Sequence, residues 1–386
     1  MLAENTLITD DEMLVDSLIE PGSYSELFMR MNNLATAIQI NKDDVVSQRE
    51  LISVLNTLGY SREAKLMCER ALSIAPDDVE VHVSYAKCLL SLGEYELAWK
   101  EYEWRMKLPG AIKVPTKGQL WDRIARKGQK LLLLADVSIA EIALNARYCS
   151  LLSDYGMSIV IQAPAEWHRY FDAIPGVKQC VVNANELNAE WYFPIGSLSQ
   201  VFSIKADDVP SVEQYVFPSD EAIFSWFKTL EAEKEKLKVG ICWRDELGKI
   251  SCPINELEQF TKIPDVSLVS LVRNPTAEER AWLEQHNVKQ VLQSSHDWMD
   301  VALCAKCLDL VLTVESECLS AAAGMGVPVW AWHSPAPEWM WCLGVKSNAW
   351  YPTVRSVRQT RVNDWSPLID ASYRTLMRAI QETGLS

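Results

Sequence analysis

The chain contains 386 residues, of which 48% are apolar and 23% charged, and it carries a formal net charge of −15. Its length suits two or three domains, and its composition is typical of a folded globular protein rather than a disordered one. The negative charge repels phosphate backbones and anionic lipid surfaces, and no Lys/Arg stripe offsets it, which excludes nucleic acid and membrane surfaces as expected partners.

The N-terminus and the cysteines indicate a cytoplasmic protein. The opening sequence MLAENTLITDDEM is acidic and lacks the apolar core of a signal peptide, and no apolar run is long enough to span a membrane. Of the 10 cysteines, only Cys304 and Cys307 form a C-x-x-C pair, and no second pair completes a zinc site. We therefore expect buried free thiols in a reducing compartment and no bound metal.

Residues 1–110 contain an internal repeat. The segments LGYSREAKLMCERALSIAPDD and LGEYELAWKEYEWRMKLPG align without a gap at an offset of about 34 residues, which places Gly59 over Gly93 and Ala64 over Ala98. A fainter copy lies one period earlier. This pattern of helix, Gly turn and helix resembles the tetratricopeptide repeat and predicts two or three such hairpins. They serve either as a groove for a protein or peptide or as a helical cap on the following domain.

Residues 111–235 show a different pattern, which predicts a first Rossmann-like lobe. Apolar strands in KLLLLADV, GMSIVIQAP and VKQCVV alternate with helical segments. This alternation is typical of a parallel, doubly wound sheet. The charged segment EAIFSWFKTLEAEKEKLK is predicted to be a helix that bridges to a second lobe.

Residues 236–386 repeat the alternation and predict a second Rossmann-like lobe with a C-terminal helix. The strands are KVGICW, VSLVSLV, VKQVL, LDLVLTV and PVWAW, and Thr276 is the expected N-cap of the helix after the second of them. Ligands of such sheets bind beyond the carboxyl ends of the strands. This rule points to the loops that follow Val137, Trp243, Val272, Val314 and Trp332.

Several of these segments together resemble a known family. The junction GEYELAWKEYEWR, the KLLLL strand and the downstream motifs LDLVLTVES, GMGVPVW, EWMW and WYPTVRSVRQ are similar to the tetratricopeptide-containing bacterial glycosyltransferases. Those enzymes are related to heptosyltransferases and, more distantly, to O-linked N-acetylglucosamine transferases. The resemblance covers residues 45–370. It implies the GT-B fold, with an acceptor on the first lobe, a nucleoside-diphosphate sugar on the second, and no metal or other cofactor.

The first lobe departs from the family pattern at the position of the catalytic base. The family has a Gly-x-Gly-Asp turn after the first strand, whereas this chain has Ser138 and Ala140 in place of the glycines and Glu141 in place of the acid. Inverting sugar transfer needs a carboxylate beside the acceptor hydroxyl, and the resemblance implies that Glu141 is this catalytic base. The alternative is that Glu141 only stabilises the start of a helix.

The second lobe also departs from the family. Its Asp-Thr pair is Glu315-Ser316 here, its following histidine is Ser320, and the arginine of its Asp-Trp-Arg-Trp motif is Met340. Two arginines at strand ends could replace the lost cations, because arginine pairs bidentately with phosphate. The predicted donor-binding residues are Arg244, Arg273, Glu315, Ser316, Ser320 and Trp339. The alternatives are surface arginines, a plain helix cap, and tryptophans that pack the hinge.

Two functional hypotheses follow. The first is an inverting, metal-independent glycosyltransferase that moves a sugar from a nucleotide-sugar donor to a protein or glycan acceptor, docked by the repeats. The second is a catalytically inactive GT-B homologue that acts as a scaffold or protein-binding module through its repeats. The surviving carboxylates favour the first hypothesis, and the lost glycines, histidine and arginines favour the second.

Overall fold

The structure is a computed structural model that describes residues 25–383 except 113, 203–204, 206–208, 210–211, 231–236 and 342–347. The predicted absence of a signal peptide at the start of the chain, residues 231–236 of the predicted bridging helix and Cys342 fall outside the described residues. The last two residues of that predicted helix, Leu237 and Lys238, begin a strand instead. Every described cysteine carries a free thiol. No helix in the described ranges has the length and apolar character of a membrane span.

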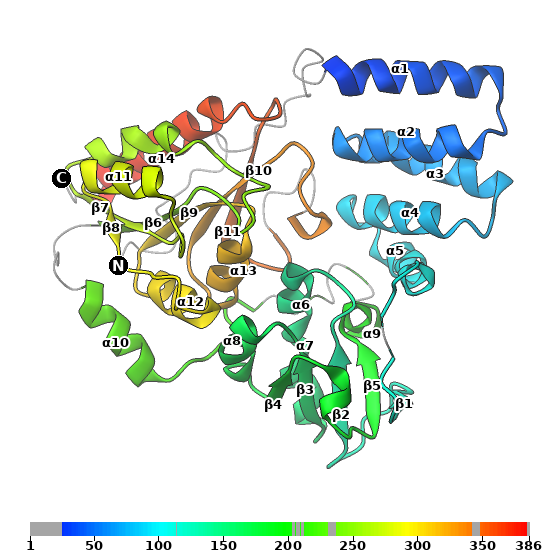
Figure 1. Ribbon diagram of the computed structural model, residues 1–386, viewed down its shortest axis with the longest axis horizontal. Coiled ribbons are helices and arrows are strands. Elements are labelled where there is room, and N and C mark those ends of the chain that lie inside the picture. The colour runs from blue at the N-terminus through cyan, green and yellow to red at the C-terminus, as the bar shows by residue number, and fades with distance from the viewer. Residues whose placement is uncertain are drawn as a thin grey trace.

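The N-terminal part is a stack of antiparallel helices beside the α/β body (Figure 1). Asp44 and Asp78 cap the second and fourth helices by accepting hydrogen bonds from backbone N–H groups of the first turn. Gly59 and Gly93, at φ of 77° and 76°, make the left-handed turns that the repeat pattern predicts. The elements are α1 Ser25–Ile40, α2 Val45–Thr57, α3 Ser61–Ile74, α4 Val79–Ser91, α5 Tyr95–Tyr102 and the 3₁₀ helix η2 Glu103–Lys107.

The first lobe is a parallel sheet of order β1-β5-β2-β3-β4, which confirms the predicted parallel sheet. The central strand β2 is almost entirely buried, as expected for a strand covered on both faces. The strands are β1 Gln119–Leu120, β2 Lys130–Leu134, β3 Ser158–Gln162, β4 Val177–Val181 and β5 Trp191–Pro194. The helices are α6 Ile139–Ala146, α7 Tyr148–Asp154, η3 Ala165–Trp167, α8 His168–Asp172, η4 Ala184–Glu186, η5 Ile195–Ser197 and α9 Leu198–Phe202.

The second lobe is a larger parallel sheet of order β11-β10-β9-β6-β7-β8. Thr276 caps its helix in a capping box with Glu279, as predicted. The strands are β6 Leu237–Cys242, β7 Val266–Ser270, β8 Lys289–Gln290, β9 Leu310–Val314, β10 Val329–His333 and β11 Val354–Arg358. The helices are α10 Asp220–Leu230, η7 Ile254–Lys262, α11 Ala277–Gln285, α12 Trp298–Lys306, α13 Glu317–Gly324, η8 Trp339–Trp341 and α14 Ser366–Thr383.

The two lobes pack directly on each other through α8 and α13. Gly324 in α13 lies against Tyr170 of α8, and a Cβ atom at Gly324 would lie 2.0 Å from the Tyr170 hydroxyl oxygen. Only glycine therefore permits this approach. The Tyr170 hydroxyl donates a 3.2 Å hydrogen bond to the carbonyl oxygen of Ser320 in the same helix. One continuous hydrophobic core includes Trp99 of the repeats, Leu131 of the first lobe and Val239 of the second.

Candidate functional site

The predicted base Glu141 lies in the first turn of α6, immediately beyond the carboxyl end of β2. Ser138 caps this helix, and its hydroxyl donates a 3.1 Å hydrogen bond to one carboxylate oxygen of Glu141. The other oxygen accepts hydrogen bonds from the Tyr102 hydroxyl and, at 2.9 Å, from the indole nitrogen of Trp339. Burial, and then the charge of Glu141, raise the pKa of Tyr102 well above its ordinary value. Glu141 is thus enclosed by donors from the protein itself.

Trp339, which donates to this carboxylate, belongs to an aromatic cluster. Trp99 of α5 meets Trp339 of η8 edge to face, with ring centroids 5.6 Å apart, and Trp350 lies 5.8 Å from Trp339. All three rings are buried. The indole of Trp339 thus contacts the carboxylate of Glu141, and the three rings together join the repeats to the second lobe.

The two predicted phosphate-binding arginines are paired with acidic residues of the second lobe. Arg244, after β6, donates to Glu279 at 3.0 Å and to the carbonyl oxygen of Asn274 at 2.7 Å. Burial raises the pKa of Glu279, but hydrogen bonds from Arg244 and other donors outweigh this effect and lower it overall. Arg273 donates to Glu246 at 2.9 Å, and its guanidinium lies 4.3 Å from the ring centroid of Trp298.

The residues predicted around the start of α13 are placed differently from one another. Ser316 is the N-cap of the helix and accepts from the backbone of Leu319 at 3.4 Å. Ser320 is 1% exposed and lies on a buried face of α13. Glu315 accepts a 3.0 Å hydrogen bond from the backbone of Glu338 and lies 3.1 Å from the Nδ1 atom of His333.

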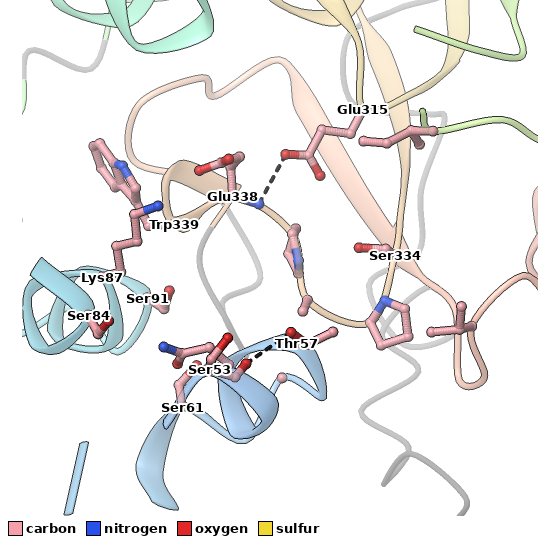
Figure 2. A pocket seen from close by; sticks show the side chains of 17 residues that line it. Ser53, Thr57, Ser61, Ser84, Lys87, Ser91, Glu315, Ser334, Glu338 and Trp339 are labelled. Carbon is pink, nitrogen blue, oxygen red and sulfur yellow. Dashed lines mark hydrogen bonds between the residues drawn. The ribbon is translucent and has the colours of Figure 1, made fainter. Parts of the chain in front are cut away.

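A pocket of about 550 Å³ lies between the repeat helices and the loop that follows β10 (Figure 2). Its volume is within the range of about 300–1,000 Å³ that is typical of small-molecule sites. The pocket lies beyond the carboxyl ends of β9 and β10, where the strand rule predicts a ligand. The lining residues are Ser53, Asn56, Thr57, Gly59, Ser61, Ser84, Lys87, Ser91, Ile250, Glu315, Ser334, Pro335, Ala336, Pro337, Glu338, Trp339 and Val362.

Only part of the predicted site reaches this pocket. Glu315 and Trp339 line it, whereas the other predicted site residues, Glu141, Arg244, Arg273, Ser316 and Ser320, are not among its lining residues. The sequence interpretation missed Lys87, which carries no motif and lies on a repeat helix. Glu338 entered the sequence interpretation only as the first residue of the motif EWMW, where it replaces the aspartate of the family motif.

Comparisons with known proteins place the α/β body among glycosyltransferase folds. The solved structure of a family 9 glycosyl transferase from Veillonella parvula aligns with 68% of this chain and 98% of its own, with 9% identity and a TM-score of 0.50. The E. coli ADP-heptose LPS heptosyltransferase II aligns with 66% of this chain and 99% of its own, with 12% identity and a TM-score of 0.47. The first likeness confirms a GT-B-like α/β body, while the tetratricopeptide identity of the helices remains a prediction.

Sequence comparison adds one curated relative. Protein FlbA of Caulobacter vibrioides is 23% identical over 350 residues, and the match covers 80% of this chain. The chain spans 57% of the length of that relative. No family model matches the sequence.

Proposed function

We propose that this protein transfers a sugar from a nucleotide-sugar donor to a protein or glycan acceptor, with inversion and without a metal ion. The observation that carries the proposal is the pocket beyond the carboxyl ends of β9 and β10, in a body with a glycosyltransferase fold. Glu315 and Trp339 belong both to the residues predicted from the sequence and to the lining of this pocket. The repeat helices form its opposite wall and are thereby positioned to present an acceptor.

The remaining predicted residues have defined roles in this proposal. In sugar transfer the acceptor oxygen attacks the anomeric carbon, a base takes its proton, and the nucleoside diphosphate leaves with the bonding electrons. Glu141 is proposed as that base, and Arg244 and Arg273 as the cations that stabilise the departing diphosphate. For these roles, Glu141 must exchange the indole of Trp339 for the acceptor hydroxyl, and the arginines must exchange their carboxylate partners for phosphate.

A second function is favoured by a specific observation. Glu141, Arg244 and Arg273 already have hydrogen-bond partners within the protein. Exchanging such partners costs free energy, because the former partner of each group is left as a buried polar or charged group that needs a new hydrogen bond. In this second proposal the protein is a catalytically inactive homologue whose repeats and pocket bind a partner molecule.

One pair of measurements separates the two functions. The full chain is first screened by thermal shift against uridine, adenosine, guanosine and cytidine diphosphates, since a ligand that binds the folded state raises the melting temperature. Release of nucleotide from the corresponding sugar donors is then measured. Stabilisation with release supports sugar transfer, and stabilisation without release supports the inactive homologue. Sugar transfer is rejected if no nucleotide binds and no donor is turned over.

A further inference from the structure

Lys87 and Glu338 contribute opposite charges to the pocket from its two walls. Lys87 lies on α4 of the repeats, and Glu338 lies just before η8 of the second lobe (Figure 2). Both side chains are exposed, and no described residue hydrogen-bonds to the charged group of either, although the charge of Lys87 acts on Glu338. An ammonium group and a carboxylate that share a pocket and lack hydrogen-bond partners among the described residues can both hydrogen-bond to a ligand.

The rest of the polar lining consists of small uncharged groups. Hydroxyls from α2, α3, α4 and the loop after β10 line the pocket together with the amide of Asn56. The Thr57 hydroxyl donates a 2.9 Å hydrogen bond to the carbonyl oxygen of Ser53, which leaves its oxygen lone pairs to accept from a ligand. The hydroxyl-bearing residues are Ser53, Thr57, Ser61, Ser84, Ser91 and Ser334.

The charge of the pocket disfavours an anionic ligand. Two carboxylates, Glu315 and Glu338, face one ammonium group, that of Lys87. The pocket walls desolvate the Glu338 carboxyl and raise its pKa; Lys87 opposes this shift, and Glu141 and Glu315 add to it. A diphosphate would meet net repulsion here. The lining instead suits a neutral ligand that offers several hydroxyl groups.

We propose that this pocket binds a neutral sugar unit, whose hydroxyls accept a hydrogen bond from Lys87 and donate one to Glu338. The inference rests on the proposed function and deepens it, because it identifies the acceptor as a neutral glycan that docks between the repeats and the second lobe. It assigns Glu315 and Trp339, which the sequence placed at the donor, to the acceptor side instead. A peptide fits this lining less well. Peptide-binding sites use a free sheet edge or a long apolar groove, whereas this pocket is lined by hydroxyl-bearing residues of three helices and one loop beside its apolar residues.

The test is saturation-transfer NMR with the full chain and four free sugars: glucose, galactose, mannose and N-acetylglucosamine. We expect saturation transfer to at least one sugar. Lys87→Met and Glu338→Gln should each weaken that binding by about tenfold, because each removes a hydrogen bond to a charged group. The matched controls Lys100→Met and Glu278→Gln change exposed charges outside the lining and should bind as the parent protein does.

The outcomes separate this inference from the proposed function, because no nucleotide is present. The inference is overturned if none of the four sugars receives saturation, or if both pocket variants bind as tightly as the controls while circular dichroism shows all proteins folded. Saturation of a Ser/Thr-rich peptide in place of the sugars would likewise overturn it and indicate a peptide site. Sugar binding without nucleotide release would preserve the inference and remove the transferase function. Transfer to a protein acceptor without sugar binding would overturn the inference and preserve the transferase function.

Discussion

The indole nitrogen of Trp339 donates a 2.9 Å hydrogen bond to the carboxylate of Glu141, and this contact joins the second lobe to the first. The same carboxylate accepts from Tyr102, the last residue of α5 in the repeat region. Three parts of the chain therefore meet at one buried anion. In this arrangement a buried charge is stable because each of its nearest neighbours is a donor.

The first prediction concerns the hydrogen bond between Trp339 and Glu141. Trp339→Phe should lower the free energy of unfolding, because it removes a donor from a buried carboxylate and reduces ring volume. Trp350→Phe is the matched control, since the Trp350 indole nitrogen is buried without a hydrogen-bond partner among the described residues. We expect Trp339→Phe to cost about 1–3 kcal/mol more than the control, as measured by urea denaturation. Equal losses would show that the hydrogen bond contributes nothing to stability.

The second prediction concerns the buried ion pair between Arg105 and Asp136. Their nearest atoms are 2.6 Å apart, and the two side chains are 7% and 2% exposed. Arg105→Met leaves the carboxylate buried without its cation and should cost about 3–5 kcal/mol, measured by urea denaturation at pH 7. Adding Asp136→Asn removes the buried charge and should recover part of the loss. A double variant less stable than Arg105→Met would contradict this account.

The pH dependence of the same variant follows from the pKa of Asp136. Burial raises this pKa above 3.8, and Arg105 partly offsets the increase. Without Arg105 the folded-state pKa should rise further. A raised folded-state pKa stabilises the protonated folded form, so this stabilisation is present at low pH and is lost as pH rises through that pKa. The loss of unfolding free energy in Arg105→Met relative to the parent protein should therefore become smaller as pH falls from neutral.

The third prediction concerns the packing of α8 against α13. Gly324→Ala would place a methyl group 2.0 Å from the Tyr170 hydroxyl oxygen and 2.9 Å from that of Tyr215. Such overpacking should cost about 1–3 kcal/mol or more, measured by denaturant titration. Tyr170→Phe removes the nearer oxygen, so the alanine should cost less in that background. An unchanged cost would mean that the two helices separate instead of clashing.

The fourth prediction uses the raised pKa of Glu338 as a second test of its environment. Its ordinary value is 4.5, and desolvation raises it in the folded state. The charged carboxylate therefore destabilises the fold increasingly as pH rises through the interval from 4.5 to the folded-state value. Glu338→Gln should raise the melting temperature at pH 7 and have little effect at pH 4.

A matched substitution should give the opposite sign. Glu258 has a pKa below 4.5 because Lys262 hydrogen-bonds to it. It therefore stabilises the fold above the unfolded-state pKa, and this effect is lost as pH falls through the lower folded-state value. Glu258→Gln should lower the melting temperature slightly at pH 7. A higher melting temperature at pH 7 for Glu258→Gln would contradict the lowered pKa of Glu258. A lower melting temperature at pH 7 for Glu338→Gln would contradict the raised pKa of Glu338.

The alternation along the chain predicted both parallel sheets, because a strand buried on both faces must be apolar throughout and the connecting helices must be amphipathic. Local signals also predicted the cap at Thr276 and the turns at Gly59 and Gly93, since each depends on residues within one turn. The GT-B-like pairing of the lobes came from motifs in the second half of the chain. The structural likeness confirms that part of the resemblance.

The environment of the site residues could not be predicted in the same way. The position of Glu141 beyond β2 followed from the order of elements, but its partner Trp339 comes from the other lobe. Likewise, Arg244 lies at its predicted strand end, but its guanidinium hydrogen-bonds to Glu279 and not to the phosphate that the sequence predicted. Lys87 reaches the pocket only because α4 packs beside the second lobe.

The sequence by itself determined which segments form strands and helices and which residues stand at the ends of the strands, because these features depend on near neighbours and on side-chain periodicity. Only the tertiary structure decided which charged groups are paired and which face open space. Pairing depends on side chains that are distant in sequence and are brought within hydrogen-bond distance by the packing of the repeats on the two lobes. For this reason the partners of the functional charged groups can be found from the tertiary structure and not from local sequence patterns.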